Sequence, residues 1–410
     1  MKKFLSKKKK AKILAAIIGG GILSGVTPAA AMDEYNIDWN GKNIFRVQYY
    51  GENESETASG FFKSVGATEN PLSWTLSEYL QTGTNKAFKW WAEIIGPGAN
   101  ISQPAQFFIG TYTAQNAGAD SFSFKNGKIY QNPNLFYEIF QNAQEVEQFT
   151  DLSEAPNVDD EDALSNFENL AFGVAVIGQN IGADVLEFGD YGWIASYDTY
   201  PSTPYINLIN INSTMFHEIG HSLGLLAPLE ISNVKLADET SFSLYNYKGE
   251  SISENSFMAH LYNQDGEQAP LENALISPSE TWLDLAKQYY SEQGKDFDFN
   301  VFTVKNVWNP TERQGKTNLY FVGDNVTEVL DGKTFTRSDG EQYSGIPINA
   351  WENGPDFSHI ELSRSMMSHQ NYRSYGNFME VELALMQDIG YDIDRKNFYG
   401  RSIYNDGLTL

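Results

Sequence analysis

The hydrophobic and polar positions along the chain change repeatedly between the two-residue period of strands and the longer period of helices. Alternating runs of β-branched and aromatic residues predict strands at residues 44–50, 106–113, 193–197 and 205–211. Apolar residues at helical spacing predict helices at residues 75–95, 163–181, 279–293 and 378–389, and one that opens at Asn212. This mixture, without a visible repeat, indicates an α+β protein.

Local signals mark the helix ends and the middle of the chain. Asn212 or Ser213 is expected to cap the helix that begins there. Asn377 is expected to cap the last helix, since Glu380 stands three residues further on. Residues 231–345 are rich in Asn, Asp and Gly turn signals, so we expect this stretch to consist mainly of loops around one helix.

The first 31 residues differ in character from the rest of the chain. They carry seven Lys and no acidic residue, followed by the apolar run Ile13 to Val26 and a small-residue site at Ala29 to Ala31. This is the pattern of a secretory signal peptide, and the apolar run is short for a membrane span. We therefore expect a secreted or cell-surface protein that contacts the membrane only during export. Cleavage would change the net charge from −25 to −32.

Composition narrows the function further. With 41% hydrophobic and 14% aromatic residues, the chain can bury a sizeable core. The absence of cysteine excludes disulfides, cysteine-zinc modules, iron–sulfur clusters and thiol nucleophiles. The strong negative charge argues against nucleic acid as a partner. An acidic stretch at residues 151–162 is expected to be a solvated loop, with a calcium site as the alternative.

One motif carries clear chemistry. His217-Glu218-Ile-Gly-His221 places two histidines four residues apart in the helix expected from Asn212. Positions i and i+4 lie on one helix face, so both imidazoles can bind one zinc ion. Glu218 lies beside them and can take a proton from a metal-activated water. The motif therefore predicts a zinc hydrolase.

A catalytic zinc ion usually has three protein ligands, and the motif supplies only two. Six residues after His221 stands Ala227, which has no donor atom, so the third ligand must come from elsewhere. The remaining histidines and two carboxylates leave several choices: His260, His359, His369, Glu239 and Glu361.

Four stretches, in order, resemble motifs of the leishmanolysins, which are zinc proteases of the metzincin type. The stretch from His217 to Leu225 is similar to their active-site helix, and Ser358-His359-Ile360-Glu361 is similar to their third-ligand motif. Ser365-Met366-Met367-Ser368 is similar to the Met-turn that follows. The segment from Glu382 to Tyr391 is similar to their closing helix, which ends in Asp-x-Gly-aromatic.

The resemblance implies a role for each matching residue. Three residues would bind a single zinc ion: His217, His221 and His359. Glu218 would be the general base, and Met367 would be the structural methionine beneath the metal. Alternatives remain open, because His359 and Met367 could be ordinary core residues and Met366 could take the place of Met367.

The resemblance also implies an architecture. After the signal peptide (1–31) we expect a catalytic subdomain with a twisted sheet, a backing helix and the active-site helix (32–227). An insertion (228–355), a C-terminal subdomain with the third ligand and the Met-turn (356–398) and a tail (399–410) would follow. Residues 395–410 are similar to the join with a passenger region in some bacterial autotransporters, which suggests a secreted or autotransporter-associated form.

The chain departs from the family in two ways. Leishmanolysins are rich in disulfides and this chain has no cysteine, so a thiol cannot keep the site latent. Two residues after Met367 stands His369, where several metzincins carry a tyrosine that stabilises the oxyanion; His369 could donate a similar hydrogen bond or could be a surface residue. His260 is expected to be structural.

The expected function is that of a zinc endopeptidase acting on extracellular proteins or peptides. Two alternatives stay open. One is a catalytically inactive cell-surface binding module on a protease fold. The other is a zinc hydrolase whose third ligand is Glu239 or Glu361.

Overall fold

The computed structural model describes residues 33–396 except for a set of internal segments. These segments are 66–70, 114–116, 126–127, 132–135, 137–139, 141–151, 153–169, 179–191, 195–207, 226–229, 248–254, 272–273, 310–313, 332–334, 337–341, 344, 352–353, 363–364 and 369–378. The expected signal peptide, the tail and almost all of the acidic stretch therefore lie outside the described residues. No helix among the described residues is long and apolar enough to cross a bilayer.

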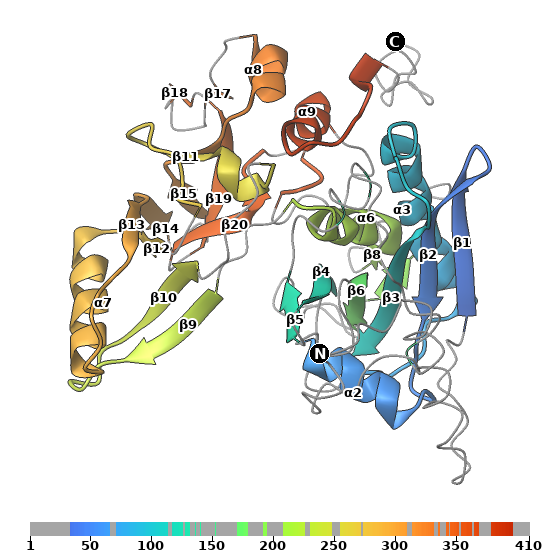
Figure 1. The fold of residues 1–410 in the computed structure, drawn as a ribbon, viewed down its shortest axis with the longest axis horizontal. Helices are drawn as coiled ribbons and strands as arrows, with labels where there is room; N and C mark the ends of the chain where they lie inside the picture. Colours follow the sequence, from blue (N-terminus) through green and yellow to red (C-terminus); the bar gives the residue numbers. More distant parts are fainter. Residues whose placement is uncertain are drawn as a thin grey trace, which may run out of the picture.

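A six-stranded mixed sheet forms the first half of the molecule (Figure 1). Its strands, in spatial order, are β1 (Asp33–Trp39), β2 (Lys42–Tyr49), β3 (Ala105–Tyr112), β6 (Leu170–Gly178), β4 (Ala117–Lys125) and β5 (Lys128–Gln131). The pairs β2–β3 and β3–β6 are parallel, and the other neighbours are antiparallel.

Helices cover both faces of this sheet. On one face, α3 (Glu78–Ile95) packs Phe88 against Phe45 and Phe107, with ring centroids 5.3 and 4.9 Å apart. On the other face, α2 (Glu56–Ser64) packs Phe61 against Phe108 of β3 at 5.5 Å. Because both faces are buried, the central strand β6 is apolar throughout, as is typical of strands in parallel sheets.

Several predicted elements are confirmed with small shifts at their ends. The strand predicted at 44–50 is β2, the strand at 106–113 is β3, the helix at 75–95 is α3, and the helix at 279–293 is α7 (Glu280–Glu292). The short strands predicted at 193–197 and 205–211 are β7 (Gly192–Ile194) and β8 (Leu208–Asn210), which pair in parallel.

The helix predicted over 163–181 is wrong for the part that the structure describes, because residues 170–178 form β6, which is buried along its whole length. The run is continuously apolar, as expected of a strand with helices or strands on every side. Gly173 interrupts the pattern for a packing reason. A Cβ on Gly173 would lie 2.3 Å from a ring carbon of Phe107 on the neighbouring strand, so only glycine lets that ring lie across β6.

Both predicted caps are also wrong. The cap of α6 (Ile211–Ser222) is Asn210, whose side-chain oxygen accepts from the amides of Asn212 and Ser213. The last helix, α9, spans Glu380–Asp388 and its N-cap residue is Met379, so Asn377 lies too far upstream to cap it. The amide of Met379 instead donates to the Glu382 carboxylate, which belongs to the first turn of the helix.

The middle of the chain is richer in strands than predicted. One sheet has the order β13 (Asn300–Thr303), β12 (Ala274–Ser277), β10 (Ser241–Tyr247), β9 (Glu230–Lys235), and α7 packs Trp282 beside Tyr245 of β10. A second sheet has the order β11 (Leu261–Asn263), β16 (Leu319–Phe321), β19 (Ile346–Trp351), β20 (Gly354–Ile360).

Smaller elements complete this half. They are the hairpin β14 (Asn306–Asn309) and β15 (Gln314–Thr317), the pair β17 (Phe335–Thr336) and β18 (Gln342–Tyr343), η2 (Phe257–His260) and α8 (Asp324–Leu330). Many of these strands are only two to four residues long, too short for the alternation of side chains to be visible in the sequence.

The segment from β20 to Tyr391 contacts both halves of the molecule. β20, which crosses the expected boundary at residue 355, pairs with β19, which lies in the stretch expected to be an insertion (Figure 1). Asp388 at the end of α9 accepts hydrogen bonds from the amides of Asn325 and Val326 and so caps α8. The hydroxyl of Tyr391 donates to the carbonyl of Leu223 at 2.7 Å, which fixes the end of α9 to the end of α6. The α+β class is therefore confirmed.

Candidate metal centre

Helix α6 presents His217, Glu218 and His221 in the centre of the molecule. It is buried on all sides, and His217 and Glu218 are only 1% and 5% exposed. The backing helix α3 fixes its position, because the indole nitrogen of Trp91 donates to the carbonyl of Phe216 at 2.9 Å. A helix held in this way leaves its histidines little freedom to move.

The end of α6 is shaped by glycine. Gly224 has a φ of 108°, in the left-handed region that favours glycine, and it ends the helix two residues after Ser222. The chain then turns back so that the carbonyl of Leu225 lies 2.9 Å from Nδ1 of His221. Any larger residue at position 224 would strain this turn.

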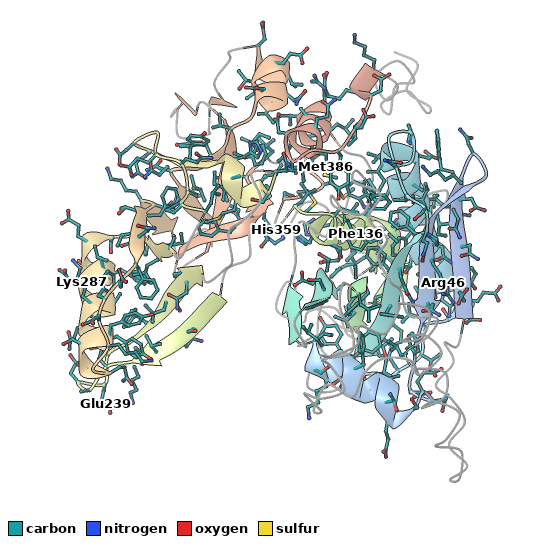
Figure 2. All side chains as sticks on the ribbon, in the orientation of Figure 1. Arg46, Phe136, Glu239, Lys287, His359 and Met386 are labelled. Carbon is teal, nitrogen blue, oxygen red and sulfur yellow. The ribbon has the colours of Figure 1, made fainter. Side chains whose placement is uncertain are left out.

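His359 reaches α6 from the other half of the molecule. It lies on β20, next to the last residue of that strand, and its side chain is half-buried. Figure 2 shows His359 at the junction between the two halves, where the end of β20 meets α6. The structure thus brings together three histidines that are separated by up to 142 positions in the sequence.

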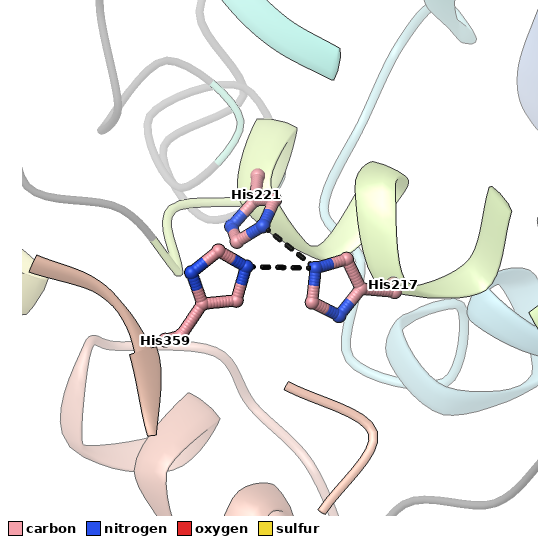
Figure 3. A group of neighbouring side chains, drawn as sticks. All are labelled: His217, His221 and His359. Atoms are coloured by element: carbon pink, nitrogen blue, oxygen red, sulfur yellow. Dashed lines mark hydrogen bonds between the residues drawn. The ribbon is translucent and has the colours of Figure 1, made fainter. Parts of the chain in front are cut away.

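The three imidazoles point their Nε2 atoms toward one another (Figure 3). The Nε2 of His217 lies 3.0 Å from that of His221 and 3.1 Å from that of His359. The rings of His217 and His359 are nearly parallel, and the ring of His221 is perpendicular to both. All three ligand atoms lie within 4.8 Å of one another, close enough to share one metal ion.

Backbone carbonyls fix the tautomers of two rings. Nδ1 of His217 lies 2.6 Å from the carbonyl of Met366, and Nδ1 of His221 lies 2.9 Å from that of Leu225. A carbonyl only accepts, so each Nδ1 carries the hydrogen and each neutral ring keeps a lone pair on Nε2. Two lone pairs therefore face each other at 3.0 Å, and neither nitrogen can donate to the other.

This donor set fits a metal ion. A cation between the Nε2 atoms removes the repulsion between the lone pairs, and carbonyls on the far nitrogens are the usual partners of metal-binding histidines. Four-coordinate zinc with bonds of about 2.0–2.1 Å needs nitrogens roughly 3.3 Å apart. The observed 3.0 and 3.1 Å are close to that spacing.

The turn Ser365–Ser368 lies against the same helix. Met367 is 2% exposed, and its sulfur lies 2.9 Å from the place where a Cβ on Gly220 would be. Met367 is thus the methionine that packs on α6 between the two helical histidines. Met366, the alternative from the sequence, contributes its backbone carbonyl to His217 instead.

The other residues considered as ligands lie elsewhere. Nδ1 of His260 contacts the carbonyl of Val322 and its ring stacks on Phe321, which is a structural environment. Glu239 is exposed, pairs with Lys235 and lies at the outer end of the half that contains α7, far from His359 (Figure 2). Glu361 belongs to no metal-binding group within the described ranges, and His369 lies outside them.

Sequence reasoning missed the groups that orient the ligands. The carbonyls of Leu225 and Met366 carry no sequence signal, because every residue has a carbonyl. Glu382 did carry a sequence signal, because it is an acidic residue beside the apolar stripe of the last helix. It is 1% exposed, and its carboxyl accepts from the Ser365 hydroxyl at 2.6 Å and from the Met367 amide at 3.0 Å.

Glu382 should make stability depend on pH. Burial raises its pKa from 4.5 to about 7, and hydrogen bonds from Met379, Ser365 and Met367 offset part of this rise. Between pH 4.5 and about 7 the folded state therefore binds more protons than the unfolded state, so the free energy of unfolding falls as pH rises.

Compared with a Glu382→Gln variant, the wild type should lose about 3 kcal/mol across this window. Urea unfolding of both metal-free proteins at about pH 5 and pH 8 measures the loss, because other titrating groups cancel in the difference. A difference that is the same at both pH values would contradict the expectation.

Comparison of the chain with known protein families, with curated proteins and with solved structures found no match. A functional proposal therefore rests mainly on the geometry of the three histidines.

Proposed function

We propose that the protein is a zinc-dependent endopeptidase that hydrolyses peptide bonds of extracellular proteins. The observation that carries the proposal is the meeting of three Nε2 atoms, two of which have their tautomers fixed by carbonyls. His217, His221 and His359 would hold the ion. Three histidines leave one position open for water or substrate, which is the donor set of a catalytic rather than a structural zinc site.

A zinc ion bound there supplies Lewis acidity, which lowers the pKa of a water and polarises a carbonyl oxygen. Glu218 would act as the general base. It follows His217 directly in α6 and is buried, so its side chain is largely shielded from bulk water. It would accept a proton from the attacking water and then transfer that proton to the leaving amine.

The order of the motifs supports a leishmanolysin-like assignment. The helix with His217 and His221, the strand with His359, the turn with Met367 and the closing helix α9 occur in that order in the sequence and meet at one place in the fold. The protein would act outside the cell or at its surface, because residues 1–31 have the pattern of a secretory signal peptide.

Metal removal tests this function. Purified protein is expected to contain one zinc per chain and to cleave casein. Dialysis against a chelator should abolish cleavage, and one equivalent of zinc should restore it, because the water is activated only with the ion in place. Elemental analysis and a casein assay on the same samples measure both. Casein cleavage that continues in protein shown to be free of metal would exclude the proposal.

A further inference from the structure

Glu382 is a buried acid that forms no hydrogen bond to the three histidines. It bonds instead to the turn that contacts them. It lies in the first turn of α9, where one oxygen accepts from the Ser365 hydroxyl and the Met367 amide. The other oxygen accepts from the Met379 amide at 2.7 Å. A single carboxyl thus ties the turn Ser365–Ser368 to the start of α9.

That turn contacts both elements that carry the three histidines, α6 and β20. The carbonyl of Met366 lies 2.6 Å from Nδ1 of His217 on α6. The carbonyl of Met367 accepts from the amide of Ile360, the residue next to His359 on β20, at 3.0 Å. The orientation of His217 and the end of β20 therefore both depend on where the turn is held.

We infer that Glu382 is a positioning residue for the metal centre: its carboxyl fixes the turn Ser365–Ser368, which in turn orients His217 and holds β20 beside His359. This inference rests on the proposed function, in which those histidines bind zinc. Outer hydrogen bonds of this kind set the tautomer and the direction of a metal-binding imidazole.

Hydrogen-bond chemistry explains why a carboxyl serves here. Three donors from two separate segments meet at one point, and an acceptor with two oxygens is needed to satisfy them. The Ser365 hydroxyl can donate to the ionised carboxylate or accept from the protonated acid, so this contact persists in both states. An apolar side chain of the same size would leave the amide of Met367 without its carboxyl acceptor.

Asp388 on the same helix provides a matched control. Its carboxylate also accepts three hydrogen bonds, from the Asn325 amide and side chain and from the Val326 amide. These bonds cap α8 and do not involve the turn. Asp388→Asn, like Glu382→Gln, keeps one oxygen and so weakens a comparable set of hydrogen bonds to α9, while leaving Ser365–Ser368 in place.

The test compares Glu382→Ala, Glu382→Gln and Asp388→Asn in the full chain. Zinc Kd is measured by competition with a coloured chelator, Tm by calorimetry, and kcat/KM with a casein-derived peptide. We expect Glu382→Ala to weaken zinc binding by about a hundredfold and Glu382→Gln, which keeps one oxygen, by about tenfold. Asp388→Asn should lower Tm but leave the zinc Kd within about twofold of the wild type.

The outcomes separate this inference from the function on which it rests. If the wild type binds zinc and cleaves peptide but both Glu382 variants keep its zinc Kd, the positioning role is wrong. A loss of affinity in Asp388→Asn equal to that in Glu382→Gln would also overturn it, because the effect would then be general destabilisation. If the wild type binds no zinc, the proposed function itself fails. Should Glu382→Ala not fold, the glutamine variant decides alone.

Discussion

Replacing Glu218 with glutamine is expected to lower kcat/KM for a peptide substrate by about 10²–10⁴-fold, the usual contribution of a general base. The glutamine side chain would keep the size of the original one but could not accept the proton of the attacking water. The three histidines would be unchanged, so the zinc content should stay at one per chain. Peptide cleavage and elemental analysis of the purified variant measure the two quantities.

This variant also distinguishes an enzyme from an inactive binding module on the same fold. A module would show no cleavage in the wild type and therefore no loss in Glu218→Gln. Glu239→Gln is the matched control, because Glu239 is an exposed acid in the insertion, paired with Lys235. Full cleavage by purified Glu218→Gln protein would falsify the assignment of the base.

Replacing His359 with alanine should raise the Kd for zinc by more than about a hundredfold, since even the loss of an outer hydrogen bond costs about 10–100-fold. His217 and His221 alone would leave two of the usual three protein ligands. The measurement is competition with a coloured chelator. Because His359 is half-buried at the end of β20, the variant should fold with a small change in Tm.

The acidic alternatives serve as comparisons for this second variant. Glu239→Ala and Glu361→Ala should each bind zinc as tightly as the wild type. If His359→Ala kept its zinc affinity while one of these variants lost it, the third ligand would be a carboxylate and the assignment would change.

Part of the fold could be predicted from the sequence because it is encoded locally. α3 has a clear apolar stripe and a Ser77 cap, and β2 and β3 have strand-like composition. β6 was missed because its continuous apolar run with Gly173 looks alike in a buried strand and a buried helix. Strands as short as β17 have no period to detect, since two residues are too few to show an alternation of side chains.

The metal-site residues likewise include some that local sequence predicts and one that it does not. The positions of His217 and His221 follow from the spacing within one helix, which is a local property. His359 comes 138 positions after His221 in the sequence, and no local pattern links them. Its selection depended on a family resemblance, and its closeness to α6 could be seen only once β20 had been placed by its pairing with β19.

The hydrogen bond from Tyr391 to Leu223 joins α6 to a segment that is synthesised much later, which affects the order of folding. During synthesis or export from the N-terminus, α6 emerges long before β20, the turn Ser365–Ser368 and α9. Contacts between segments so far apart form late in folding, because a long stretch of chain must first be ordered. A metal centre built in this way stays incomplete until β20, the turn Ser365–Ser368 and α9 have folded against α6. On the proposed function, that delay would protect the producing cell from proteolysis without a thiol, which this chain lacks.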